Sequence, residues 1–185
     1  MQLGIIGLGH MGGNIARRLM LNGHATVVYD RNEAFVKGLS EEGATGVADL
    51  KRDDKGVWQA TRAAAPMMGN GGSIINIASA TVLSGSPQWM HYVASKGAVI
   101  GLSRTMAKEM GADGVRVNVL APGFTMTEAS LGLMENARSY GVDRAALKRP
   151  AEVEDIVGGA LMLASPLSGY MTGQTLVIDG GRQFI

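Results

Sequence analysis

Short apolar runs alternate along the chain with longer segments whose apolar residues recur at helical spacing. Such runs predict strands, and the segments between them predict helices. Strands are predicted at residues 2–6, 25–29, 43–48, 73–78, 115–120 and 175–178, and helices at residues 32–42, 57–68, 90–110 and 151–163, with a further helix between Gly12 and Asn22. This alternation is typical of an α/β domain with helices on both faces of a parallel sheet. We therefore expect a three-layer, doubly wound, Rossmann-like fold.

Length and composition favour one domain over residues 1–185 and argue against several classes of function. The 185 residues are 46% hydrophobic and carry a net charge of +1, so neither a nucleic acid nor an anionic membrane is expected as a partner. Cysteine is absent and His10, His24 and His91 lack ligand spacing, so no metal site is expected. No apolar run reaches about 18 residues, and Met1 leads into a glycine motif rather than a signal peptide. A cytoplasmic protein is expected.

The first predicted strand ends in a glycine motif that opens the first helix, Gly7-Leu-Gly9-His-Met-Gly12. Glycines at this spacing let the chain turn tightly and let a pyrophosphate approach the helix N-terminus. Asp30 follows the second strand, 18 residues after Gly12, where a carboxylate accepts hydrogen bonds from an adenosine ribose. The pattern predicts a dinucleotide site with NAD as its cofactor. A turn packed for structural reasons is the alternative.

This amino-terminal part resembles the start of a decarboxylating 6-phosphogluconate dehydrogenase. The similarity covers residues 1–51, through Gly-Leu-Gly-His-Met-Gly-Gly-Asn-Ile-Ala-Arg-Arg-Leu and Val-Val-Tyr-Asp-Arg-Asn. It implies cofactor contacts at Gly7, Gly9, Gly12, Asp30 and Arg31, and we add Met11 from the same motif. Arg31 could stack on adenine or pair with a 2′-phosphate, so NADP stays an alternative. That family's substrate site and sugar-acid chemistry are not expected here.

A tyrosine and a lysine stand four residues apart at the start of the long predicted helix, in Tyr92-Val-Ala-Ser-Lys96. This spacing places the phenol and the ammonium on one helical face, one turn apart. The ammonium stabilises a phenolate, so Tyr92 could exchange a proton with an alcohol or carbonyl oxygen, and Lys96 could hold a nicotinamide ribose. Ser79 ends the strand before this helix, where its hydroxyl could bond the same oxygen. Taken alone, the pair is more often a surface Tyr and Lys of an amphipathic helix.

Residues from about 55 to 185 resemble the carboxyl-terminal half of the short-chain dehydrogenase/reductase family. Four motifs occur in that family's order: Ile-Ile-Asn-Ile-Ala-Ser79, Tyr92-x-x-x-Lys96, Val-Arg-Val-Asn-Val-Leu-Ala-Pro122-Gly123 and Thr-Gly-Gln-Thr-Leu-Val-Ile-Asp-Gly-Gly. The resemblance implies hydride transfer between a nicotinamide and a secondary alcohol or ketone. It implies that Ser79, Tyr92 and Lys96 are catalytic. It places four further residues beside the nicotinamide, namely Pro122, Gly123, Thr125 and Thr127.

The same resemblance implies a substrate lid and an assembly. Residues 127–148 would form the lid, expected as a mobile helical excursion, with Arg138, Tyr140 and Arg144 as unspecific contacts. Trp89 and His91 would lie beside the substrate loop. The helices at 57–68 and 90–110 have small-residue faces like those through which this family forms dimers and tetramers. A homo-oligomer is therefore expected.

The junction of the two similarities departs from both families. A short-chain enzyme would begin with TGxxxGxG and carry Asn-Asn-Ala-Gly before Val57, and Asp53 stands where it has an asparagine. We interpret the chain as a chimera of two nucleotide-binding halves joined near residues 50–54, with the sheet shortened by one βα unit. In the expected strand order 3-2-1-4-5-6, residues 73–78 pair directly with residues 2–6. This pairing moves Ser79 about 4.8 Å toward the glycine turn.

Such a shift could stop hydride transfer while NAD binding survives, because catalysis depends on close alignment of the reacting groups. Three hypotheses therefore stay open. The first is an NAD(P)-dependent oxidoreductase of short-chain type. The second is a non-catalytic dinucleotide-binding chimera, and the third is a chimera that only folds.

Overall fold

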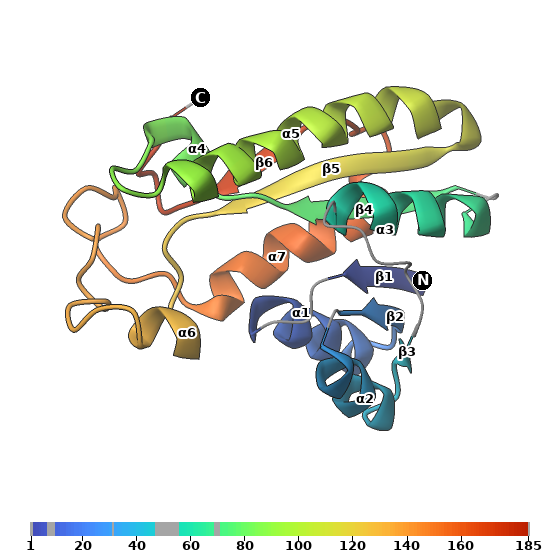
Figure 1. The fold of residues 1–185 in the computed structure, drawn as a ribbon, viewed down its shortest axis with the longest axis horizontal. Helices are drawn as coiled ribbons and strands as arrows, with labels where there is room; N and C mark the ends of the chain where they lie inside the picture. The colour runs from blue at the N-terminus through green and yellow to red at the C-terminus, as the bar shows by residue number, and fades with distance from the viewer. Residues whose placement is uncertain (1, 7–9, 31, 47–55, 69–70, 185) are drawn as a thin grey trace.

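The computed structural model describes residues 2–6, 10–30, 32–46, 56–68 and 71–184 (Figure 1). Its strands are β1 (Gln2–Ile6), β2 (Ala25–Tyr29), β3 (Thr45–Gly46), β4 (Gly72–Ile77), β5 (Val115–Pro122) and β6 (Thr175–Ile178). Its α-helices are α1 (His10–Leu21), α2 (Glu33–Glu41), α3 (Gly56–Ala64), α4 (Thr81–Ser84), α5 (Met90–Met110), α6 (Glu128–Leu131) and α7 (Val153–Ala164). Short 3-10 helices follow α3, α5 and α7 as η1 (Ala65–Met67), η2 (Gly111–Asp113) and η3 (Pro166–Ser168). The predicted α/β class is confirmed.

The strands form two parallel three-stranded sheets instead of the single sheet that we expected. One sheet has the order β1-β2-β3 and the other the order β4-β5-β6, so the predicted order holds within each half. The predicted pairing of β4 with β1 is wrong for the described residues, in which β4 pairs with β5.

One backbone carbonyl at the outer edge of β4 is bonded to a side chain. The N–H groups of Ala78 and Ala80 donate to carbonyls of β5 at 2.9 and 3.0 Å. Because successive residues direct their backbone groups to opposite edges of a strand, the Ile77 carbonyl points to the edge where β1 would pair. Nζ of Lys96 donates to that carbonyl at 3.0 Å. A side chain thus satisfies this edge group, and the predicted displacement of Ser79, which depended on the β1–β4 pairing, loses its basis.

The two halves meet through side chains instead of a backbone ladder. In Figure 1, α7 lies between α1 and the second sheet, and α5 covers the opposite face of that sheet. Ile15 and Leu19 of α1 share a core cluster with Ile156 and Leu163 of α7 and with Leu120 of β5. All five are nearly inaccessible to solvent, and burying each such side chain contributes roughly 1.5–3 kcal/mol. The α1–α7 contact therefore holds the amino-terminal half against the second sheet.

Three predicted elements differ in length from those observed. Of the strand predicted at 43–48, the structure describes residues 43–46, and β3 covers the last two of these. The helix predicted at 57–68 ends in η1, which includes Pro66. The predicted lid, residues 127–148, contains one short helix, α6, followed by turns. Thr127 caps α6, and Gly141 has a positive φ of 75°, which interrupts any helix through the lid.

An ion pair at the start of α7 is expected to make the free energy of unfolding depend on pH in the acid range. Asp155 accepts bonds from Nη1 and Nη2 of Arg149 at 2.6 Å each and from the Glu152 N–H at 2.8 Å. These bonds lower the pKa of Asp155 from its usual 3.8 to about 2. Because the folded pKa is depressed, the stabilisation is complete above pH 3.8 and is lost as the pH falls toward 2.

We expect Asp155→Asn to cost about 1 kcal/mol near neutral pH, a value reduced for the exposure of the pair. The cost should shrink as the pH falls below 3.8, since the natural protein then loses the same interaction. Urea unfolding of both proteins across this range measures the difference. Unfolding free energies that differ by a constant amount at every pH would contradict the assignment.

Candidate active site

Ser79 lies two residues beyond the end of β4, at the carboxyl end of the second sheet, and is buried. Its hydroxyl oxygen accepts bonds from Oγ1 of Thr81 at 2.9 Å and from the Thr81 N–H at 3.3 Å. Both bonds use the oxygen as an acceptor, so the Ser79 hydrogen stays available to a ligand oxygen. Thr81 thus orients Ser79, a role that the sequence motifs did not predict.

Tyr92 and Lys96 share one face of α5, as their spacing predicted. Nζ of Lys96 lies 5.9 Å from the centre of the Tyr92 ring, and Trp89 packs edge-on against that ring at 5.7 Å. The lysine also donates to the Ile77 carbonyl, two residues before Ser79. Burial lowers the pKa of Lys96 from its usual 10.5 because the ammonium is partly removed from water. The structure therefore brings Ser79, Tyr92 and Lys96 to the same end of β4.

Pro122 is the last residue of the neighbouring strand, β5, and Gly123 follows it. The Pro122 carbonyl accepts from the Ala80 N–H at 3.0 Å, and the Gly123 N–H donates to Ile178 of β6 at 2.8 Å. These bonds tie together the carboxyl ends of β4, β5 and β6. A methyl group built on Gly123 would lie 2.8 Å from Cβ of Asp179, so close packing alone already requires glycine here.

Thr125 and Thr127, also predicted beside the nicotinamide, hold the entry to the lid. Oγ1 of the buried Thr125 donates to the Gly123 carbonyl at 3.2 Å. Oγ1 of Thr127 accepts from the Ser130 N–H at 3.1 Å, and Oγ of Ser130 accepts from the Thr127 N–H at 2.8 Å, which caps α6. Both threonines therefore already have partners within the chain.

The amino-terminal half supplies the other predicted cofactor residues. Helix α1 begins at His10 shortly after β1 ends, and Gly12 is half-buried within it. Asp30 follows β2 and accepts a bond from the Asn32 N–H at 2.7 Å. Met11 lies in α1, but its side chain falls outside the described part of the structure. Three further predicted contacts also lie outside the described residues, namely Gly7, Gly9 and Arg31.

Other sequence expectations concern the lid and the junction. Arg138 of the lid pairs with Glu152 at 3.8 Å, and Tyr140 packs against Phe124 with ring centres 4.8 Å apart. Asp53, at the junction, lies outside the described residues. In the described ranges, no group of three or more acidic or histidine side chains could hold a metal ion, and no helix is long and apolar enough to cross a membrane.

Two family models match successive parts of the chain. Residues 50–183 match the family described as enoyl-(acyl carrier protein) reductase, and residues 2–56 match the family described as NADP oxidoreductase, coenzyme F420-dependent. The first match spans well over half of the chain. The second coincides with the part that contains the glycine motif and Asp30.

Curated relatives share the carboxyl-terminal similarity. The chain is 41% identical over 151 residues to a 3-oxoacyl-[acyl-carrier-protein] reductase FabG of Thermotoga maritima, covering 80% of this chain and 61% of that protein. It is 40% identical over 129 residues to a 3alpha-hydroxysteroid dehydrogenase of Mediterraneibacter gnavus, covering 69% and 52% of the two chains. The chain thus spans between about half and three fifths of the length of these relatives.

Solved structures show the same fold over the whole chain. A short chain dehydrogenase/reductase family protein superimposes with a TM-score of 0.84 at 28% identity, covering 98% of this chain and 96% of the other. A short-chain dehydrogenase/reductase from Brucella melitensis, described as a glucose/ribitol dehydrogenase, superimposes with a TM-score of 0.85 at 20% identity, covering 100% of this chain and 97% of the other. With the family match over residues 50–183, these findings show that the chain belongs to the short-chain dehydrogenase/reductase family.

Proposed function

We propose that the protein is an NAD(P)-dependent oxidoreductase that interconverts a secondary alcohol and a ketone. The observation that carries this proposal is the grouping of Ser79, Tyr92 and Lys96 at the carboxyl end of β4. Ligands of open parallel sheets bind at this edge, outside the ends of the strands. A hydroxyl donor, a phenol and a desolvated ammonium together provide what proton exchange with a carbonyl or alcohol oxygen requires.

The residues present fit a dinucleotide. Helix α1 presents its N-terminus after β1, where backbone N–H groups can bind phosphate. Asp30 follows the neighbouring strand β2 and can accept hydrogen bonds from a ribose, which favours NAD, with NADP as the alternative. Nζ of Lys96 donates one bond to Ile77, so two of its three protons remain for a second ribose. When bound, the nicotinamide supplies the hydride chemistry that no side chain can provide.

Each proposed catalytic residue then has one task. In the reducing direction, Tyr92 donates its phenolic proton to the substrate oxygen while the carbonyl carbon gains a hydride, and in the oxidising direction it takes that proton back. Ser79 donates to the same oxygen and fixes its position. Lys96 stabilises the phenolate and anchors the ribose, with the Ile77 carbonyl holding its ammonium in place.

We further infer a chimeric origin and a single domain over residues 1–185. The two family matches meet at residues 50–56, close to the junction near residues 50–54 that the motifs suggest. The motifs of residues 1–51 also resemble 6-phosphogluconate dehydrogenase, which is the amino-terminal parent that we propose. Support for one domain comes from the core cluster that joins α1 to α7 and β5.

The test is turnover by the purified full chain. Because two of the named relatives act on 3-oxoacyl groups or on a hydroxysteroid, the first substrates are a 3-oxoacyl ester with NADH or NADPH and a hydroxysteroid with NAD. We expect substrate-dependent change in nicotinamide absorbance. Saturable cofactor binding without any turnover would instead support the non-catalytic binding module. A cooperatively folded protein that binds no cofactor would support the hypothesis of folding alone.

We also propose a homo-oligomer formed through α5. Four of its exposed positions are small or apolar, namely Ala94, Ala98, Gly101 and Leu102. Small side chains let two helices approach closely, and α3 contributes the exposed Trp58. We expect light scattering to give at least the mass of a dimer, and Ala98→Glu to lower it. A monomeric mass for the natural protein would contradict this.

A further inference from the structure

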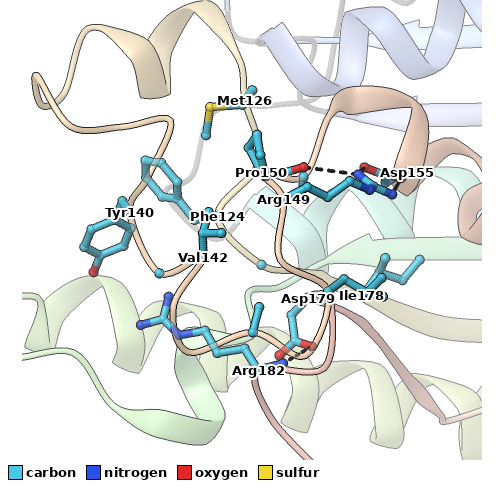
Figure 2. A pocket seen from close by; sticks show the side chains of 16 residues that line it. Phe124, Met126, Tyr140, Val142, Arg149, Pro150, Asp155, Ile178, Asp179 and Arg182 are labelled. Atoms are coloured by element: carbon cyan, nitrogen blue, oxygen red, sulfur yellow. Dashed lines mark hydrogen bonds and ion pairs between the residues drawn. The ribbon is translucent and has the colours of Figure 1, made fainter.

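A pocket of about 150 Å³ lies between the lid and the carboxyl-terminal segment (Figure 2). Phe124, Tyr140 and Val142 line one side, and Ile178 and Arg182 line the other. The described lining residues include none of Ser79, Tyr92 and Lys96. The pocket therefore contains none of the three proposed catalytic side chains, although it adjoins the proposed active site through Gly123 and the lid.

The guanidinium of Arg182 is held at the wall of this pocket. It lies 5.5 Å from the centre of the Tyr140 ring, and that ring packs against Phe124. A methyl group built on Gly141 would lie 2.5 Å from Nη1 of Arg182, so the guanidinium occupies the space that glycine leaves. Stacking on an aromatic face orients an arginine while its edge stays free to bind an anion.

Among the charged side chains of the pocket, Arg182 has no ion-pair partner in the described residues. Arg149 forms two bonds with Asp155, and the carboxylate of Asp179 accepts from the N–H groups of Gly181, Arg182 and Gln183 at 2.9–3.1 Å. No described carboxylate pairs with the guanidinium of Arg182. The pocket therefore combines one unpaired cation with walls that are mainly apolar.

We propose that this pocket binds a small aromatic carboxylate. A benzene ring fits an apolar protein cavity of about 150 Å³, so a six-membered ring matches the space beside Phe124, Val142 and Ile178. A carboxylate on that ring would meet Arg182, whose planar guanidinium can donate two parallel hydrogen bonds to it. Because the pocket joins lid residues to the segment after β6, such a ligand would fix the lid against the body of the protein.

Calorimetric titration with benzoate, and with benzyl alcohol as its uncharged counterpart, tests the inference on the natural protein. We expect saturable benzoate binding in the millimolar range or tighter, and affinity for benzyl alcohol lower by about tenfold or more, because a charge-assisted pair is lost. Equal affinities for the two ligands, or no binding of benzoate, would overturn the proposal. This comparison uses no variant and no catalytic readout, so its outcome is independent of the proposed function.

Variants of the lining residues test whether benzoate binds in this pocket. Arg182→Gln should weaken benzoate binding by about tenfold or more and leave benzyl alcohol binding unchanged. The benzoate affinity of Arg182→Lys should lie between those of the natural protein and Arg182→Gln. Val142→Phe should abolish the binding of both benzoate and benzyl alcohol, because the larger side chain would fill the pocket. Arg104→Gln removes the same charge from the exposed surface of α5 and is the matched control. Benzoate binding that is reduced equally by Arg182→Gln and Arg104→Gln would show general charge attraction and refute this site.

Discussion

Tyr92→Phe is expected to lower turnover by about 100- to 10,000-fold, which is the range that a positioned acid or base contributes. The substitution removes one oxygen atom and keeps the ring, so the edge-on contact with Trp89 and the position beside Lys96 should persist. Cofactor affinity and thermal stability should therefore stay close to those of the natural protein. Initial rates at saturating cofactor, with a melting curve in parallel, measure both effects.

Tyr170→Phe is the matched control, because Tyr170 is fully exposed after η3. It should leave turnover unchanged. If Tyr92→Phe kept the natural rate, Tyr92 could not be the proton donor, and the mechanism would be refuted. A variant that lost NADH affinity as well as turnover would point to a disturbed site rather than to a lost proton.

Lys96→Met is expected to lower turnover by about 100-fold or more and to raise KM for the cofactor. The ammonium that stabilises the phenolate and contacts the ribose is then absent. Stability should stay within about 1 kcal/mol, because relief of the desolvated charge offsets the lost bond to the Ile77 carbonyl. Turnover of the natural protein should also fall as the pH rises and Lys96 loses its proton. Because burial lowers the pKa of Lys96, this fall should occur below the usual lysine pKa of 10.5.

Two further variants separate charge from position. Lys108→Met removes an exposed lysine near the end of the same helix and should change neither turnover nor KM. Lys96→Arg keeps the charge but brings a larger planar group into the partly buried space, so it should rescue little activity. Full activity in Lys96→Met would remove this lysine from the proposed site.

The sequence predicted the local elements well, because the spacing of apolar residues along the chain differs between strands and helices. The one-turn spacing of Tyr92 and Lys96 follows from helical geometry, and the structure places both on one face of α5. Ser79 was predicted at the end of a strand for a similar reason, and it lies two residues after the end of β4.

Contacts between distant segments could not be predicted in the same way. The single sheet was expected from family topology, yet Lys96 satisfies the Ile77 carbonyl at the edge of β4, and α1 joins the second half through α7. Side-chain motifs carry no signal for a backbone acceptor such as this carbonyl. The role of Thr81 in holding Ser79 was missed because threonine after a strand is common. The pocket at Arg182 depends on the close approach of Gly141, which only the folded chain shows.

Energy transfer from tryptophan to NADH tests most directly whether the two halves form one site. Trp58 and Trp89 both lie in the carboxyl-terminal half, and Trp89 packs against Tyr92, whereas Asp30 lies in the amino-terminal half. Titration of a Trp58→Phe variant with NADH should give saturable sensitised emission of NADH when Trp89 is excited. Asp30→Ala should weaken the NADH affinity by about tenfold. Saturable NADH binding without energy transfer from Trp89, or no binding by the folded protein, would contradict a shared cofactor site.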